Sequence, residues 1–78
     1  MTAFKMTIKL VSPTSEFYLS VPETDSVAAL KTAVRRTWGS EYFTLHHNSV
    51  KMRSDKLLSA YGVRDGSIIK VAYFAEFP

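Results

Sequence analysis

Apolar residues alternate with polar ones in two consecutive stretches near the start of the chain, and this constrains the fold most. The stretches cover residues 5–11 and 16–21. Because successive side chains of a strand point to opposite faces, both stretches predict half-buried strands. The turn formers Ser12-Pro13-Thr14-Ser15 separate them, which predicts a β-hairpin. The side chains expected on its buried face are Met6, Ile8, Leu10, Phe17, Leu19 and Val21.

The apolar spacing changes to about 3.6 residues after this hairpin, which predicts a helix from Val27 to Trp38. Ser26 is the expected N-cap, because its hydroxyl can accept from a free N–H of the first turn. Gly39 suits the left-handed position that ends many helices. The apolar face of this helix would consist of Val27, Leu30, Val34 and Trp38.

The second half of the chain predicts three shorter strands and one helical turn. The strands are expected at residues 42–47, 50–52 and 67–73, and the helical turn at 56–62. The order is therefore β-β-α-β-β-(short helix)-β, an α+β fold. We predict a single domain over residues 1–73, followed by an aromatic tail at 74–78.

Length and composition exclude several classes of protein. The chain has 78 residues, of which 46% are hydrophobic, and it has no Cys, so we expect one small core without disulfides or thiolate-bound metals. The sequence lacks a long apolar run and a secretory signal pattern. We therefore expect a cytoplasmic or nuclear protein that does not contact membranes, and a monomer.

The segment Leu57-Leu58-Ser59-Ala60-Tyr61-Gly62-Val63, followed by a polar turn at 64–66 and an alternating strand, resembles the ubiquitin-like β-grasp superfamily. The resemblance implies a mixed sheet of four to five strands around one helix, with the first and last strands parallel at its centre. It also implies that Leu58, Tyr61 and Val63 close one end of the sheet, and that the Tyr61 hydroxyl bonds to the backbone of a nearby loop. Lys31 matches a lysine that pairs with an acid in ubiquitin, and Asp55 is the partner expected here.

Two departures from the ubiquitin pattern bear on function. Ubiquitin-like modifiers end in Gly-Gly, whereas no Gly-Gly occurs in this chain, so conjugation is not expected. On the sheet face that ubiquitin presents to its receptors, the family's isoleucine matches His46. The flanking valine and histidine match Ala72 and Lys70, so most of that apolar patch is replaced.

Three sub-families share features with the chain. Residues 43–48 and 61–64 resemble the ubiquitin-like protein of the minor spliceosome. The aromatic ending resembles the splicing-linked modifier that binds non-covalently, and the compact size resembles ubiquitin-like components of bacterial type VII secretion. All three imply a fold that serves as a docking surface.

Two surfaces are candidate binding sites. The outward sheet face should bind a protein partner non-covalently, and the aromatic tail is a second candidate for the same role. The alternative is a small basic component of a ribonucleoprotein, which would contact RNA or an acidic partner through one helix face; the formal net charge is +3. The residues are Thr44, His46, Ile68, Lys70 and Ala72 for the sheet face, Tyr73, Phe74 and Phe77 for the tail, and Lys31, Arg35 and Arg36 for the helix.

Catalysis, metals and cofactors are not expected. His46 and His47 are neighbours in a predicted strand and would point to opposite faces, so they cannot bind one ion together. The acids are scattered, and no motif places a nucleophile on a strained turn. The sequence therefore predicts a protein that is not an enzyme and has no cofactor.

Overall fold

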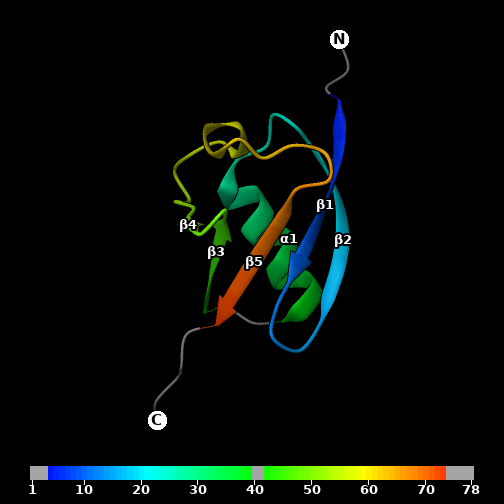
Figure 1. Ribbon diagram of the computed structural model, residues 1–78, viewed down its shortest axis with the longest axis vertical. Coiled ribbons are helices and arrows are strands. Elements are labelled where there is room, and N and C mark those ends of the chain that lie inside the picture. Colours follow the sequence, from blue (N-terminus) through cyan, green and yellow to red (C-terminus); the bar gives the residue numbers. More distant parts are fainter. Residues whose placement is uncertain (1–3, 40–41, 74–78) are drawn as a thin grey trace.

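The protein forms a five-stranded mixed sheet with one long helix on a single face (Figure 1). The structure is a computed structural model that describes residues 4–39 and 42–73, with the backbone alone at Tyr73. Phe74 and Phe77 of the predicted tail lie outside the described residues. The elements are β1 (Lys5–Val11), β2 (Glu16–Pro22), α1 (Val27–Trp38), β3 (Phe43–His47), β4 (Val50–Lys51), the 3₁₀ helix η1 (Leu58–Tyr61) and β5 (Ile68–Tyr73).

The strand order is β2-β1-β5-β3-β4, which places the first and last strands side by side at the centre. β1 and β5 are parallel, whereas the β1–β2, β3–β5 and β3–β4 pairs are antiparallel. The predicted α+β architecture and the predicted parallel pair are therefore confirmed.

The core lies between the inner face of the sheet and α1. Ile8 and Leu10 of β1, Leu30 of α1 and Ile69 of β5 are all 0% exposed. Full burial of one such side chain contributes about 1.5–3 kcal/mol. Trp38, the last residue of α1, is only partly buried and packs against this core.

Both predicted ends of α1 are confirmed. The Ser26 hydroxyl accepts from the Ala29 N–H at 3.1 Å. Gly39 has φ +72°, in the left-handed region, and its N–H donates to the Arg35 carbonyl at 2.7 Å. The helix is 12 residues long, and no helix among the described residues is long and apolar enough to cross a membrane.

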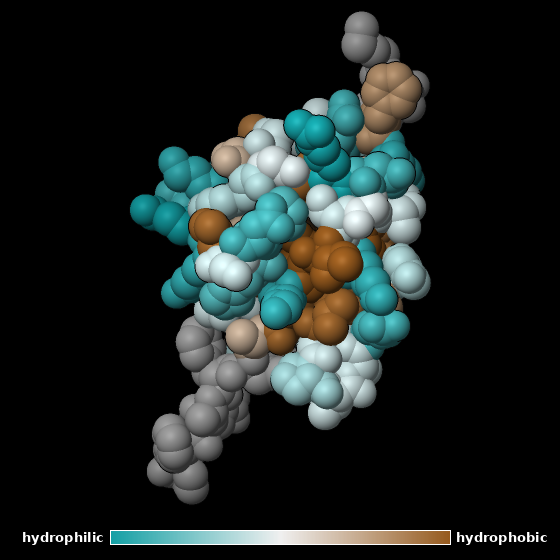
Figure 2. Space-filling view, viewed as in Figure 1, coloured by the Kyte–Doolittle hydropathy of each residue, from teal (hydrophilic) through white to brown (hydrophobic). Residues whose placement is uncertain are grey.

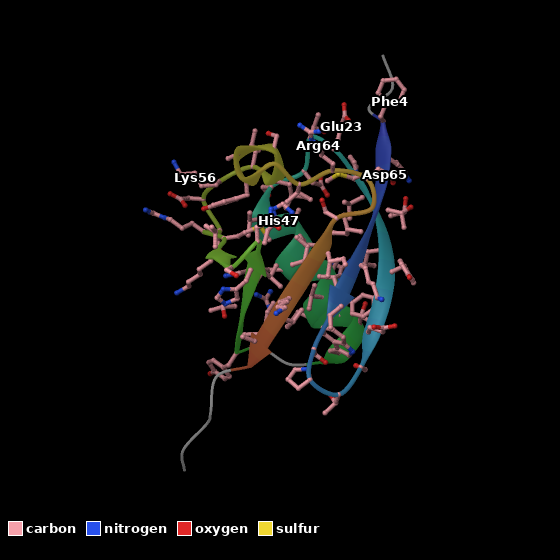
Figure 3. The ribbon with its side chains drawn as sticks, in the orientation of Figure 1. Phe4, Glu23, His47, Lys56, Arg64 and Asp65 are labelled. Carbon is pink, nitrogen blue, oxygen red and sulfur yellow. The ribbon has the colours of Figure 1, made fainter. Side chains whose placement is uncertain are left out.

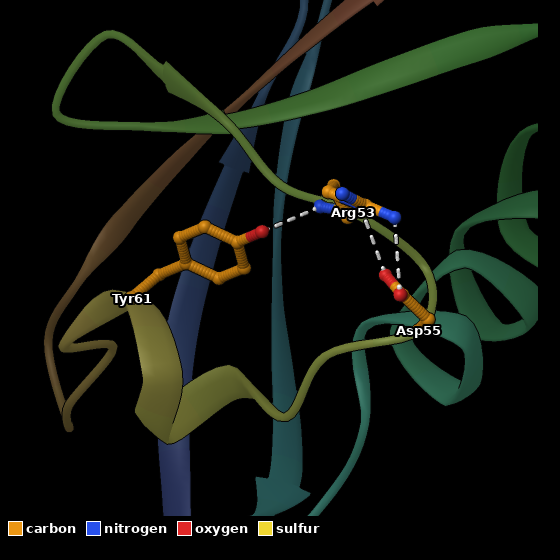
Figure 4. Close-up of polar contacts among 3 residues, drawn as sticks. All are labelled: Arg53, Asp55 and Tyr61. Carbon is orange, nitrogen blue, oxygen red and sulfur yellow. Dashed lines mark hydrogen bonds and ion pairs between the residues drawn. The ribbon is translucent and has the colours of Figure 1, made fainter.

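One end of the sheet is closed by η1 and the residues that follow it. Leu58 is fully buried and Val63 nearly so. The Tyr61 hydroxyl accepts from the Arg53 N–H at 2.9 Å, which confirms the predicted tie to a neighbouring loop (Figure 4). The His47 ring, labelled in Figure 3, adds a second tie, because its Nδ1 lies 2.8 Å from the Tyr61 carbonyl oxygen.

The predicted ion pair between Lys31 and Asp55 is wrong. Asp55 instead faces Arg53, with Oδ1 and Oδ2 each 3.2 Å from a guanidinium nitrogen (Figure 4). Two residues in one loop form this pair with little loss of chain freedom. Lys31 makes no ion pair with any residue in the described part of the chain.

Several predicted boundaries were too wide. η1 begins at Leu58 rather than at Lys56, because the preceding segment is extended and bonds to the start of α1. Its contacts are Val27 N–H to the Lys56 carbonyl at 2.9 Å and Leu58 N–H to the Asp25 carbonyl at 3.0 Å. β3 and β5 each begin one residue later than predicted, and β4 ends at Lys51. Met52, which follows β4, has a buried side chain, and its N–H still donates to the Leu45 carbonyl of β3 at 2.8 Å.

Candidate functional site

The outer face of the sheet, turned away from α1, carries most of the predicted site residues. The strand register aligns its side chains in rows that cross the sheet. One row runs Tyr18–Lys9–Ile68 across β2, β1 and β5. The next row, which crosses all five strands, is Glu16, Val11, Lys70, His46 and Lys51.

Apolar side chains gather at the centre of this outer face. Figure 2 shows them as a brown patch over β1 and β5. Ile68 is 54% exposed and Tyr18 is 66% exposed. Val11 is half-buried between them and the β1–β2 turn, and Ala72 is exposed. An apolar centre of this kind is what a small protein interface needs.

A hollow of about 390 Å³ opens beside this centre. The β1–β2 turn forms one wall, and β5 and β3 form the others. Ser12 fixes the turn, because its N–H donates to the Ser15 carbonyl at 2.8 Å and its hydroxyl accepts from the Ser15 N–H at 3.1 Å. The residues that line the hollow are Val11, Ser12, Pro13, His46, Lys70, Val71 and Ala72.

A second, more polar hollow of about 410 Å³ lies on the other side of Ile68. Asp65 lies in its wall, and its carboxylate accepts from the Thr7 N–H at 2.7 Å. That bond anchors the turn that leads into β5, so Asp65 has a structural task at the edge of the outer face. The lining residues are Thr7, Lys9, Tyr18, Asp65, Gly66 and Ile68.

The charge on the outer face is mainly positive. Lys9 lies 3.3 Å from a Glu16 carboxylate oxygen and 5.9 Å from the centre of the Tyr18 ring, so its charge is partly compensated. Lys51 and Lys70 form no ion pair with residues in the described ranges. The apolar centre is therefore bordered by uncompensated cations.

The structure brings four of the five predicted face residues together and corrects the fifth. His46 and Lys70 are directly paired, Ala72 follows on β5, and Ile68 lies beside them. Thr44 is not a contact surface, since it is only 7% exposed. The Thr44 hydroxyl lies 2.8 Å from His46 Nε2, and this hydrogen bond orients the His46 ring.

Sequence reasoning missed three residues of the face: Val11, Pro13 and Tyr18. The alternation already placed Val11 and Tyr18 outward, which was the available signal. Their proximity to Lys70 and Ile68 depends on the parallel register between β1 and β5, which pairs residues almost sixty positions apart. Val11 and Tyr18, from the neighbouring strands β1 and β2, therefore add apolar surface to the same outer face.

The two histidines have separate roles. His46 belongs to the outer face, whereas His47 is 8% exposed and bonds to the Tyr61 carbonyl on the side of η1. Within the ranges that the structure describes, no group of three metal-ligating side chains occurs.

The predicted basic helix face lies on α1, on the other side of the sheet from the outer face. Arg35 and Arg36 are exposed and Lys31 is half-buried. All three lack an ion pair with the described residues. The described part of Tyr73 ends β5, so nothing tests the predicted aromatic tail.

Comparison with solved structures decides the fold. No protein-family model matches the chain, and no curated protein matches it in sequence. The ubiquitin-like domain of the Arabidopsis thaliana protein At2g32350 superimposes with a TM-score of 0.87 at 21% identity, over 92% of this chain and 80% of that one. The chain has a ubiquitin-like β-grasp fold.

Two further structures agree. The N-terminal ubiquitin-like domain in the 4931431F19Rik protein gives a TM-score of 0.89 at 16% identity, over 99% of this chain and 82% of that one. A crystal structure of ATBAG1 in complex with HSP70 gives 0.82 at 16% identity and covers 87% of this chain; the chain spans only 40% of that longer one. The resemblance to splicing proteins gains no support from these matches and stays a prediction.

Proposed function

We propose that the protein is a non-covalent protein-binding module whose main contact surface is the outer face of the sheet. The observation that carries this proposal is the exposed apolar centre on the central strand pair, β1 and β5. Ile68 is 54% exposed, although it stands next to Ile69, which is fully buried. An exposed apolar cluster with a polar rim is typical of interaction sites.

The mechanism is surface docking. Small apolar side chains of the partner would enter the hollow between Val11, Pro13 and Ala72, and acidic groups would contact Lys70 and Lys51 at its rim. His46, oriented by Thr44, offers a directional hydrogen-bond group. One solved structure with this fold contains ATBAG1 in complex with HSP70, which supports a protein as the class of partner.

The alternative from the sequence, a ribonucleoprotein component, rests on Lys31, Arg35 and Arg36. Nucleic-acid sites usually combine a dense basic patch with stacking aromatics or a phosphate-binding loop. Three cations on one helix supply only the first of these features, so we favour the outer face.

A matched pair of variants tests the proposal. Ile68→Asp places a charge at the centre of the outer face, whereas Leu57→Asp changes an equally exposed apolar residue (51%) outside the sheet. Partner proteins recovered on the wild-type chain from lysate of its own host should be lost with Ile68→Asp and kept with Leu57→Asp. Equal recovery on both folded variants would contradict the proposal.

A further inference from the structure

Three basic side chains form one row on the outer face, across β4, β3 and β5. The strand register places His46 directly opposite Lys51 on one side and directly opposite Lys70 on the other. Directly opposed residues of an antiparallel pair have Cβ atoms about 4.5–5.5 Å apart. The two flexible lysine side chains can therefore reach toward the ring between them, and all three side chains can contact a single ligand.

The positive charge of this row has no counterion in the described part of the chain. β3, β4 and β5 contain no acid. Glu16 ends the same row on β2, but its carboxylate lies 3.3 Å from Lys9. Lys51 and Lys70 are exposed, and neither forms an ion pair with a described residue. Charge complementarity therefore favours an anion as the ligand.

His46 adds a directional donor to the two lysines. The Thr44 hydroxyl lies 2.8 Å from His46 Nε2 and forms no other hydrogen bond with the residues that the structure describes. Donation from this hydroxyl to Nε2 satisfies its proton, and the neutral ring then carries its own proton on Nδ1. Nδ1 has no partner within the described ranges, so it is available to donate to a bound anion.

A phosphate group matches this row better than a carboxylate does. A phosphorylated side chain carries a charge of about −1.5 to −2 at pH 7 and has three acceptor oxygens. The row supplies two ammonium groups and one ring N–H, so each oxygen can meet a different donor. A carboxylate carries a single charge and compensates only one of the two lysines.

The adjoining hollow indicates that the phosphate belongs to a protein segment. His46 and Lys70 also line the hollow of about 390 Å³, whose other walls include Val11, Pro13 and Ala72. A free phosphate ion would leave this apolar space unfilled, whereas a phosphorylated segment can place a neighbouring apolar side chain in it. Apolar contact and charge compensation then act on the same ligand.

We propose that Lys51, His46 and Lys70 bind the phosphate group of a phosphorylated segment of the partner protein, and that an apolar side chain next to it enters the hollow. The inference rests on the proposed function, because it names the chemistry that the outer face selects. Binding then depends on the phosphorylation state of the partner. Dephosphorylation removes the charge and the three oxygens together, and so releases the segment.

The test follows amide chemical shifts of the labelled whole chain with two capped peptides. Both consist of alanine and valine around one central serine, which is phosphorylated in the first peptide only. The phosphorylated peptide should bind about tenfold more tightly, with the largest shifts at His46, Lys51 and Lys70. The Lys51→Gln/Lys70→Gln variant should lose this preference. The matched control Lys56→Gln/Arg64→Gln removes two exposed cations at the η1 end (Figure 3) and should keep it.

The two peptides keep the proposal falsifiable if the double variant fails to fold, because both are compared on the wild-type chain. Equal affinity for the two peptides would overturn the phosphate site. So would equal binding of a third peptide with glutamate in place of the phosphoserine, or tighter binding of a short single-stranded RNA at the same residues. Inorganic phosphate that binds as tightly as the phosphorylated peptide would contradict the use of the hollow.

Phosphatase treatment separates this proposal from the proposed function. Recovery of the partner from host lysate should fall when the lysate is treated with phosphatase, and it should be lost with Ile68→Asp. Recovery that is lost with Ile68→Asp but unchanged by phosphatase would refute the phosphate site and leave the outer face as the contact surface.

Discussion

The two faces of β5 differ in their exposure to solvent, although their residues alternate along one strand. Ile69 and Val71 point into the core and are 0% and 2% exposed. Ile68, Lys70 and Ala72 point outward and are exposed. The comparison teaches that adjacent residues can serve the core and the exposed surface separately, because successive side chains of a strand point to opposite faces. The same division runs through β1, where Leu10 is buried and Lys9 meets solvent.

The largest loss of stability is expected for a substitution on the inner face of the sheet. Ile69→Ala removes a fully buried side chain of the central parallel pair, where Ile69 lies opposite Leu10. It should lower the free energy of unfolding by about 2–5 kcal/mol, since lost burial and the cavity left behind add together. Urea unfolding followed by circular dichroism measures this. If the free energy of unfolding fell by no more than it does for a surface substitution, the inner face would not differ from the outer face in its contribution to stability.

Two tyrosines extend the comparison, because Tyr61 bonds to a loop within the fold and Tyr18 lies on the outer face. Tyr61→Phe removes the hydroxyl that accepts from the Arg53 N–H, and should cost about 0.5–1.5 kcal/mol. Tyr18→Phe, on the outer face, removes an exposed hydroxyl and should leave stability within about 0.5 kcal/mol of wild type. The same unfolding experiment compares them, and equal losses would contradict a structural role for the Tyr61 hydroxyl.

The ion pair between Arg53 and Asp55 should contribute less to stability than Ile69 and the Tyr61 hydroxyl do. Arg53 and Asp55 side chains are 70% and 59% exposed, so water screens their attraction. Asp55→Asn should lower stability by about 0.2–1 kcal/mol at low salt, and by less in high salt. Lys31→Met should show no coupling to it in a double-mutant cycle. A clear coupling energy would revive the ion pair between Lys31 and Asp55 that the structure replaces.

The smallest effect on stability is expected at Ile68, directly beside Ile69. Ile68→Thr keeps a β-branched shape on the outer face and should change the free energy of unfolding by no more than about 0.5 kcal/mol. Binding to the partner should nevertheless weaken measurably by isothermal titration. A variant that unfolds easily yet binds normally would reverse the assignment of the two faces.

Most of the fold could be predicted from local patterns. The closure of the sheet by Leu58 and Val63 followed from the resemblance to the ubiquitin-like superfamily. Alternation predicted β1 to its last residue, and Ser26 and Gly39 predicted the limits of α1. These features depend on residues close together in the chain, where turn, cap and periodicity act directly.

The site could be predicted only in part, because it depends on contacts between distant residues. The outward side of β5 followed from alternation, but the hollow beside it needs Val11 and Pro13, which only the β1–β5 register brings near Ala72. Thr44 lies 2.8 Å from His46 and Asp55 pairs with Arg53, each only two positions away, but several polar side chains near each of them could have been the partner. Alternation and turn signals therefore predict none of these three arrangements.

Mapping the contact surface of the recovered partner tests the central claim most directly. The purified partner protein would be titrated into labelled chain while amide chemical shifts are followed. The account predicts the largest shifts at Val11, Ile68, Lys70 and Ala72, and their loss with Ile68→Asp. Shifts confined to Lys31, Arg35 and Arg36, with the outer face silent, would contradict it.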